Sequence, residues 1–441
     1  MQNKVKWTIS ILLVFIAILF LAIPKLIGIV IHDAIAEQVF EQINTSTEGQ
    51  ITITDPQLET GWFRSKIQFN IVISDTQNRV EPYYLLFQGI ISHGPILFAP
   101  SEFALGLVSI HVTVNADKLE SKVATITTDD METSVVVKFD QSLSIRAKVK
   151  NISIRNSEEN LYTTIDDLDA YIDINEDLSA RADIKSSKIL IQNNQSDIRL
   201  TASDPSLHLE TAKLDDVSAA SAIEVKIPST VASEPLSFNV SNAILEWRSY
   251  SSNKSAELTD FSQYMQAKKI ESNLPLESFI WKSEMRGVTE ELIRSYNEML
   301  FNIQSASSID PILRMAELTQ IANKTGLLLL QNEINFTNII EANFYQGMHK
   351  LDVNVLWGGL PALPSIDSLM FKDAAEALNV EVNLLLDQES VSLSPFAELA
   401  ELYSSQNYLM SSNDELTLDA KLTKGIVTLN GESFPLDQLL Q

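Results

Sequence analysis

Residues 167–185 read DLDAYIDINEDLSARADIK, and this stretch decides the fold class. Every second side chain through most of it is apolar: Leu168, Ala170, Ile172, Ile174, Leu178, Ala180, Ala182 and Ile184. A period of two is typical of a strand with one buried and one solvated face. Fully buried parallel strands would read as continuous apolar runs, so the pattern predicts antiparallel sheet.

The same alternation covers about residues 50–250, for example at Ile67, Phe69 and Ile71. No helix-length apolar period interrupts it, which argues against repeated βαβ units. Between Val149 and Ile152 the alternation slips by one residue. That slip predicts a bulge or a bend in the strand.

Helical periods appear after about residue 285. Thr289 precedes two glutamates as a helix N-cap, Asp310-Pro311 is a typical helix start, and Gly326 is a typical helix end. We interpret the apolar helical stripes as core-packing surfaces, with a groove-lining role as the alternative. The expected helices cover residues 288–303, 310–326, 367–378 and 394–408, and the expected closing strands cover 416–422 and 426–429.

The N-terminal segment predicts a membrane anchor. Residues 7–23 carry no charge, and apolar residues resume at 26–31 after Pro24 and Lys25. A helix over that whole stretch is long enough to cross a roughly 30 Å hydrocarbon core. A cleaved signal peptide is the competing interpretation, but no small-x-small cleavage site follows the apolar run.

Lys4 and Lys6 precede this segment, so the positive-inside rule places the N-terminus in the cytoplasm and the bulk of the chain in the periplasm. The predicted fold class is α+β and mostly antiparallel β, with an N-terminal transmembrane helix and several amphipathic helices in the C-terminal third. The expected parts are a cytoplasmic tail (1–6), a transmembrane anchor (7–31), a juxtamembrane helix (32–48), a β-rich region (49–270) and an α+β region (271–441), the last two periplasmic and continuous.

Composition narrows the function classes. The 441 residues are 45% hydrophobic and 20% charged, as in folded proteins, with a formal net charge of −26. This acidity argues against nucleic acid as a partner and against lying flat on an anionic membrane. We interpret it as a solubility feature, with an acidic ligand-binding surface as the alternative. Cysteine is absent, which excludes disulfides, thiol catalysis and cysteine-ligated zinc.

No catalytic, cofactor or metal constellation is recognisable. The five histidines form no HExxH or HxH pattern, and no phosphate loop, dinucleotide fingerprint or serine elbow is present. Asp167, Asp169 and Asp173 on one strand face could suggest calcium, but the EF-hand spacing is missing, and a solvated face is the preferred interpretation. His93 beside a turn could act as a general base, but no partner is identifiable, so a structural role is predicted.

Three short patterns carry a family resemblance: GWFRSK at 61–66, ISHGPILF at 91–98 and KGIVTLNGESFPL at 424–436. In this order they resemble the bacterial YdgA-like family, whose members carry a domain of unknown function. The middle of the chain, about 115–250, matches nothing in that pattern. The motif residues, all interpreted as structural, are Gly61, Phe63, Ser65, His93, Gly94, Pro95, Gly425, Asn430 and Gly431.

The resemblance implies a Gram-negative inner-membrane protein that faces the periplasm, and it implies no reaction. The first functional hypothesis is a non-enzymatic envelope protein that acts as a scaffold or binds partner proteins. The second is a carrier of lipid or another hydrophobic ligand in a β-lined groove, by analogy with envelope lipid-bridging proteins. A hydrolase built from scattered residues, with His93 as its best candidate, is a weaker third. A closed apolar core would favour the scaffold, and an open groove the carrier.

Overall fold

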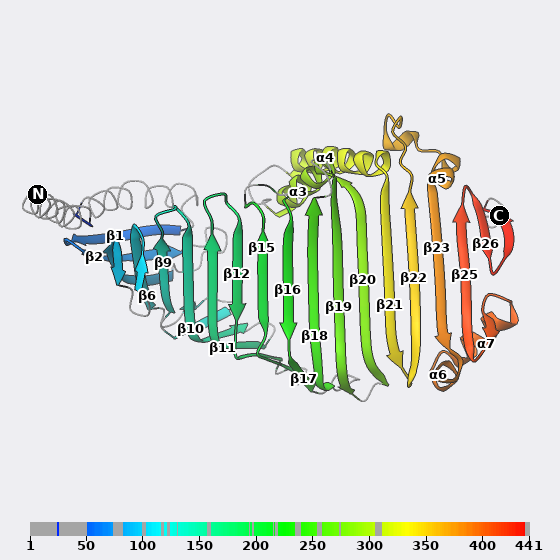
Figure 1. Ribbon diagram of the computed structural model, residues 1–441, viewed down its shortest axis with the longest axis horizontal. Coiled ribbons are helices and arrows are strands. Elements are labelled where there is room, and N and C mark those ends of the chain that lie inside the picture. The colour runs from blue at the N-terminus through cyan, green and yellow to red at the C-terminus, as the bar shows by residue number, and fades with distance from the viewer. Residues whose placement is uncertain are drawn as a thin grey trace, which may run out of the picture. The chain divides into compact units, whose positions relative to one another are not determined.

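The computed structural model forms two compact units, Met1–Leu207 with Ser233–Pro235, and His208–Ala232 with Leu236–Gln441, called unit 1 and unit 2 below (Figure 1). Each unit is built mainly from antiparallel strands. The structure describes residues 24–25, 51–73, 83–98, 103–115, 119–120, 124–129, 131–156, 160–193, 195, 198–214, 216, 219–233, 240–253, 258–272, 275–304 and 311–436.

Unit 1 is a meandering antiparallel sheet. Its main order is β1–β2–β3–β6–β9–β10–β11, and β11 pairs with β12 along one half and with β13 along the other. The strands are β1 (Ile51–Thr60), β2 (Arg64–Ile73), β3 (Tyr83–His93), β4 (Ile96–Phe98), β5 (Phe103–Leu105), β6 (Val108–Asn115), β7 (Leu119–Glu120), β8 (Ala124–Thr128), β9 (Met131–Val137), β10 (Leu143–Asn156), β11 (Leu161–Ile174), β12 (Ala180–Lys185), β13 (Lys188–Asn193) and β14 (Ile198–Ser203).

The core of unit 1 lies where β1, β2, β3 and β6 meet. Ile53, Ile67, Ile91 and Val108 are buried together there, one from each of these four strands. Alternate apolar residues of consecutive strands thus close one side of the sheet, as the period of two predicts.

The pairing of β10 with β11 shows no bulge where the sequence predicts a bulge or a bend. Val149 pairs with Leu168 and Asn151 pairs with Asp166, so the register continues unchanged past this point. The irregularity falls on the partner strand, where Asp167 has a left-handed φ of 52°. At the same place β10 exchanges β9 for β8 as its other neighbour. The apolar pattern therefore marks a change of neighbour rather than an inserted residue.

The strands of unit 2 pair antiparallel in the order β16–β18–β19–β20–β21–β22–β23–β25–β26–β27, with β17 beside β18 and β24 beside β25. The boundary between the units falls within β15 (Ser206–Thr211). The strands of unit 2 are β16 (Ser221–Ile227), β17 (Ser229–Ser233), β18 (Val240–Asn253), β19 (Leu258–Ser272), β20 (Leu276–Thr289), β21 (Ile334–Phe344), β22 (Gly347–Trp357), β23 (Leu378–Asp387), β24 (Met410–Ser412), β25 (Glu415–Thr423), β26 (Ile426–Leu429) and β27 (Glu432–Pro435).

The helices of unit 2 are insertions between strands that pair with each other. β20 pairs with β21 across α3 and α4, and β23 pairs with β25 across α6 and α7 (Figure 1). The helices are α3 (Glu290–Gln304), α4 (Pro311–Gln331), η2 (Ile366–Ser368), α5 (Phe371–Ala377), α6 (Gln388–Leu393) and α7 (Ala397–Ser405).

The predicted α+β class with a transmembrane helix is contradicted, although its mostly antiparallel β content agrees with the described residues. The described residues are mostly antiparallel strand, because the helical patterns of the C-terminal third are such insertions and do not interrupt the sheet. Two helix bounds also differ from prediction. α4 continues past Gly326, where the lack of a side chain lets Ile366 approach the helix closely, and the helix expected at 367–378 is divided into η2 and α5.

The described residues include no helix with the length and apolarity needed to cross a membrane, which contradicts the transmembrane helix of the predicted fold. Most of the segment on which that prediction rests, residues 7–31, lies outside the described residues, as does the expected juxtamembrane helix at 32–48. Pro24 and Lys25 are described and are helical.

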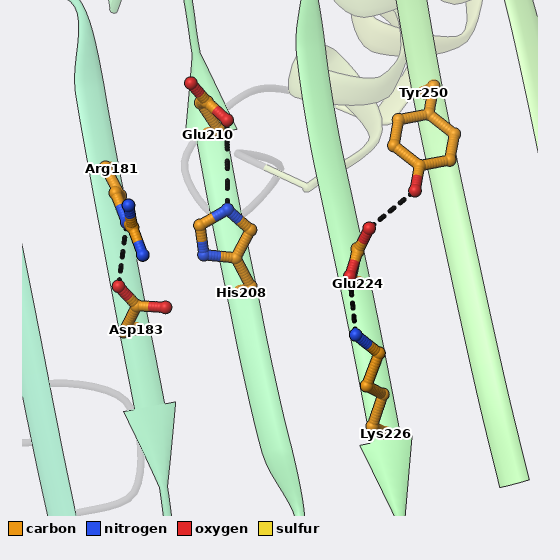
Figure 2. Close-up of polar contacts among 7 residues, drawn as sticks. All are labelled: Arg181, Asp183, His208, Glu210, Glu224, Lys226 and Tyr250. Atoms are coloured by element: carbon orange, nitrogen blue, oxygen red, sulfur yellow. Dashed lines mark hydrogen bonds and ion pairs between the residues drawn. The ribbon is translucent and has the colours of Figure 1, made fainter.

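One face of the sheet in unit 2 is charged. Pairs of opposite charge two residues apart recur along its strands, such as Lys226 with Glu224 at 3.0 Å and Arg248 with Glu246 at 3.4 Å. Figure 2 shows the same spacing on three strands, including Arg181 with Asp183 in unit 1, and Tyr250 donating to Glu224 at 2.6 Å. Side chains two residues apart in a strand lie on the same face of the sheet, so these pairs make that face polar and solvated. Exposed pairs of this kind contribute only about 0–1 kcal/mol each.

Candidate functional site

The first two sequence motifs meet at one point in unit 1. The backbone N–H of His93, at the end of β3, donates to the carbonyl oxygen of Phe63 at 2.9 Å. The His93 Nε2 lies 3.1 Å from the Ser65 Oγ, and its Nδ1 lies 3.4 Å from the Trp62 carbonyl oxygen. Segments about 30 residues apart are thereby joined through one imidazole.

The protonation of His93 follows from its partners. A carbonyl oxygen only accepts, so Nδ1 carries the hydrogen and Nε2 accepts from the Ser65 hydroxyl. Burial lowers the pKa of His93, and the charge of Lys25 adds to this effect, while hydrogen bonds to the carbonyls of Trp62 and Pro24 oppose it. The ring is therefore neutral near pH 7.

This arrangement resembles a serine–histidine pair but fits a structural role. Ser65 and His93 are each only 2% exposed, so a substrate does not reach the hydroxyl. Gly94 is required by packing, because a Cβ there would collide with the carbonyl oxygen of Gly106, and Gly61 is crowded by the carbonyl oxygen of Arg64 in the same way. Pro95 follows Gly94 through a cis peptide bond. Phe63, in contrast, is half exposed and adds no core.

The third motif forms two tight turns at the end of unit 2. Gly425 (φ 74°) lies between β25 and β26, and Asn430 with Gly431 (φ 49° and 91°) lies between β26 and β27, as expected of a hairpin at Asn-Gly. The Asn430 amide also donates to the carbonyl oxygens of Asn407 at 2.9 Å and Tyr408 at 3.1 Å. The hairpin thus holds the segment that follows α7.

A pocket of about 600 Å³ lies between α6, α7 and the strands beneath them, and we call it the α6–α7 pocket. This volume is in the range of sites that hold small molecules. Strands β21, β22, β23 and β25 form its floor, and the two helices, with the residues between and after them, form its walls. The lining residues are Phe344, His349, Leu384, Leu386, Ser390, Val391, Ser394, Phe396, Leu399, Ala400, Tyr403, Tyr408, Leu409 and Leu418.

The start of α6 is fixed by Asp387. Its carboxylate accepts from the Ser390 backbone N–H at 2.8 Å and from the Ser390 hydroxyl, which is N-cap geometry. These two hydrogen bonds lower the pKa of Asp387. Ser390 packs directly on Gly347, where any Cβ would collide with the serine oxygen. The helix is thereby seated on the β21–β22 hairpin.

The lining of the pocket offers hydrocarbon contact and almost no charge. It contains no Lys, Arg, Asp or Glu, and its buried polar groups are already bonded inside the protein. Ser390 bonds Asp387, the Ser394 hydroxyl donates to the Val391 carbonyl at 2.8 Å, and His349 Nε2 donates to the Phe344 carbonyl at 3.1 Å. An uncharged apolar molecule therefore fits this pocket, whereas a buried charged group would lack a partner.

Two apolar patterns in the sequence indicate the surfaces that line this pocket, outside the three family motifs. Leu384 and Leu386 lie two residues apart in β23, and Leu416 and Leu418 lie two residues apart in β25. The two strands pair with each other, so these side chains share a face. Within 394–408, Phe396, Leu399 and Tyr403 recur at helical spacing. Sequence alone did not indicate that this helical face and that sheet face enclose a space.

Among the described residues, no group of three or more His, Cys, Asp or Glu side chains is placed to hold a metal. The three aspartates that could suggest a calcium site are bonded to protein groups instead. Asp169 pairs with Arg146 at 2.8 Å, Asp173 lies 3.8 Å from Lys138, and Asp167 accepts from Ser187 at 2.9 Å. These contacts fit the solvated, paired strand face that the alternation favours.

Residues 3–437 match a family described as bacterial proteins of unknown function, DUF945. Neither the comparison with curated proteins nor the comparison with solved structures gave a match.

Proposed function

The chain belongs to this bacterial family of unknown function, DUF945, and we propose that it is a non-enzymatic binding protein that holds an acyl chain or a similar hydrophobic molecule in the α6–α7 pocket. The observation that carries the proposal is the lining, which is apolar, contains no charged side chain and encloses about 600 Å³. Transfer of apolar surface from water into such a site contributes roughly 25 cal/mol per Å². The narrower YdgA-like resemblance is compatible with this function and stays a prediction.

The lining also limits the chemistry of the ligand. Without lysine or arginine in the pocket, an anionic headgroup would find no counter-ion and would stay outside. The pocket is therefore a site for the tail of a lipid. It accepts the hydrocarbon part and makes no contact that selects a headgroup.

The test uses diphenylhexatriene, a neutral hydrocarbon probe that fluoresces in apolar surroundings, with the purified full-length chain. We expect saturable fluorescence with the wild-type chain. Leu399→Glu places a charge at the wall of the pocket and should weaken binding by about tenfold or more, because a charge is poorly tolerated in apolar surroundings. Leu399 is partly exposed, so this substitution is compatible with folding.

The matched control is Leu393→Glu. Leu393 is exposed on α6 and does not line the pocket, so binding should equal that of the wild type. Equal binding by the wild type and both variants would show that the probe adheres elsewhere, and the proposed function would then be abandoned.

A scaffold that binds envelope proteins is the second candidate. It is favoured by apolar side chains that α7 and the residue before it leave exposed, Phe396 and Leu402 among them. Large exposed apolar patches often mark protein interfaces. Under this alternative Leu402→Glu would abolish a specific protein cross-link and leave probe binding unchanged.

We also propose that the protein acts in the periplasm, as expected from the uncharged segment at 7–23 preceded by Lys4 and Lys6. Alkaline phosphatase fused to the C-terminus is active only after export. An inactive fusion of full length would contradict this location.

A further inference from the structure

An apolar row crosses the sheet of unit 2 at right angles to its strands. In the strand register, Trp247 of β18 pairs with Met265, which pairs with Trp281, Ile340, Leu351 and Leu384 in turn. We call this row the apolar track. It covers six neighbouring strands, and at about 4.8 Å per strand it is about 24 Å long. That exceeds the roughly 15 Å that the acyl chains of one membrane leaflet span.

The side chains of the track carry few hydrogen-bonding groups. Apart from the thioether sulfur of Met265, the polar groups on these side chains are the indole N–H groups of the two tryptophans. The indole N–H of Trp281 donates to the Asn338 side chain at 3.0 Å. Methionine adds a flexible contact that suits irregular hydrocarbon. On one side of the track, the next row on the same face is polar, with Ser249, Gln263 and Ser283 paired across three strands. On the other side the apolar surface continues with Leu245, Ala267 and Phe279, so the polar border lies on one side only.

The buried clusters of unit 2 lie beside the track rather than over its middle. One joins α3 to Val288 and Ile334, and the other joins α6 and α7 to Leu409 and Leu416. Met265 keeps 38% of its surface exposed. On the reverse face the ion pair of Lys350 with Glu341 faces water. The sheet therefore has one charged face and one apolar face. The described residues do not bury the centre of the apolar face.

The track is continuous with the α6–α7 pocket, because Leu384 belongs to both. We propose that the track binds the acyl chain of a membrane lipid laid across the strands, with its end in the pocket. The inference rests on the proposed function and extends it from the pocket alone to an elongated site. A hydrocarbon occupant fits because the row offers apolar area without charge, and its only strong hydrogen-bonding groups are the indole N–H groups of Trp247 and Trp281.

The test is photo-crosslinking of the full-length chain in living bacteria. p-Benzoylphenylalanine replaces Met265 on the track, Leu399 at the pocket, or Gln263 as the control. Gln263 is exposed on the same strand and the same face as Met265, one row away. After irradiation the chain is purified under denaturing conditions, and adducts are identified by mass spectrometry. We expect phospholipid adducts at Met265 and Leu399, several-fold above those at Gln263.

The outcomes separate the two proposals. Adducts at Leu399 without adducts at Met265 would overturn the track and leave the pocket. A cross-link from Met265 to a protein, whether a second copy or another chain, would make the face a protein interface and would also overturn the track. Adducts at neither position would overturn both proposals. Should the Met265 variant lose wild-type protease resistance, Ile340, two strands along the track, takes the probe instead.

Discussion

Ser65 and His93 show how single residues hold unit 1 together. Their side chains lie 28 positions apart and meet at 3.1 Å, and the same imidazole reaches the Trp62 backbone. Both side chains are buried, so water cannot replace a lost partner. In the structure these motif residues connect two turns through one buried, hydrogen-bonded imidazole.

Ser65→Ala should destabilise the protein by about 1–3 kcal/mol, because it leaves the buried Nε2 of His93 without a donor. Urea unfolding measures the change. Ser153→Ala is the control, since its hydroxyl donates to Asn151 at 3.1 Å in a half-buried position where water can substitute. Equal midpoints for wild type and Ser65→Ala would show that the bond does not stabilise the fold.

The lowered pKa of His93 predicts a pH dependence. The unfolded chain takes up the proton first as the pH falls below the ordinary value of 6.5, because the folded state resists protonation of this ring. Stability should therefore fall as the pH decreases from about 6.5, above the range in which carboxylates protonate. The urea midpoint at pH 7.5 and pH 5.5 measures this loss.

The same measurement on His93→Gln should show a smaller loss between these two pH values, since glutamine does not titrate. His111→Gln on β6 serves as the control in the same unit. An identical pH dependence in His93→Gln and wild type would refute the assignment.

At the scale of elements, the pocket depends on how α6 and α7 are seated. α6 has only six residues and is too short to be stable alone, so its cap and its packing determine its position. Val391, Ala400, Leu409 and Leu416 form the buried cluster beneath the helices. The position of the pocket walls therefore depends on these few contacts.

Asp387→Ala should cost about 1 kcal/mol through loss of the N-cap and should also weaken binding of diphenylhexatriene. Thermal unfolding and probe titration measure the two effects. Asp387→Asn keeps an oxygen that accepts from the Ser390 N–H and should retain most of both properties. Unchanged probe binding in Asp387→Ala would separate the cap from the pocket.

At the scale of the whole molecule, the proposed ligand-binding features, the pocket and the track, lie in unit 2 and the family-motif contact at His93 lies in unit 1. A ligand that binds only the folded state stabilises the part it contacts. The net charge of −26 does not favour anionic lipid, so ligand capture should rely on hydrocarbon contact.

Hydrogen exchange followed by mass spectrometry should therefore show a local effect of added neutral phospholipid. We expect slower exchange in β19 to β23 and in α6 and α7, and unchanged exchange in β1 to β6. Leu399→Glu should reduce the effect around α7. Protection confined to unit 1 would place the lipid site elsewhere.

The sequence by itself determined the antiparallel strands, the turns at Gly94-Pro95 and Asn430-Gly431, and the absence of cysteine chemistry. These features depend on a period of two and on local backbone preferences, which neighbouring residues specify. The match across residues 3–437 confirms the bacterial family of unknown function. The α+β class was mispredicted, because helical periods do not reveal that strands pair across the helices.

Only the tertiary structure decided which apolar faces are closed and which stay open. Ser65 meets His93, and Leu384 joins a track to a pocket, through pairings between segments distant in sequence. Alternation states that a strand has an apolar face, but what covers that face depends on register and on where α6 and α7 are seated. The candidate site therefore emerged from the fold, although every residue in it follows an ordinary sequence pattern.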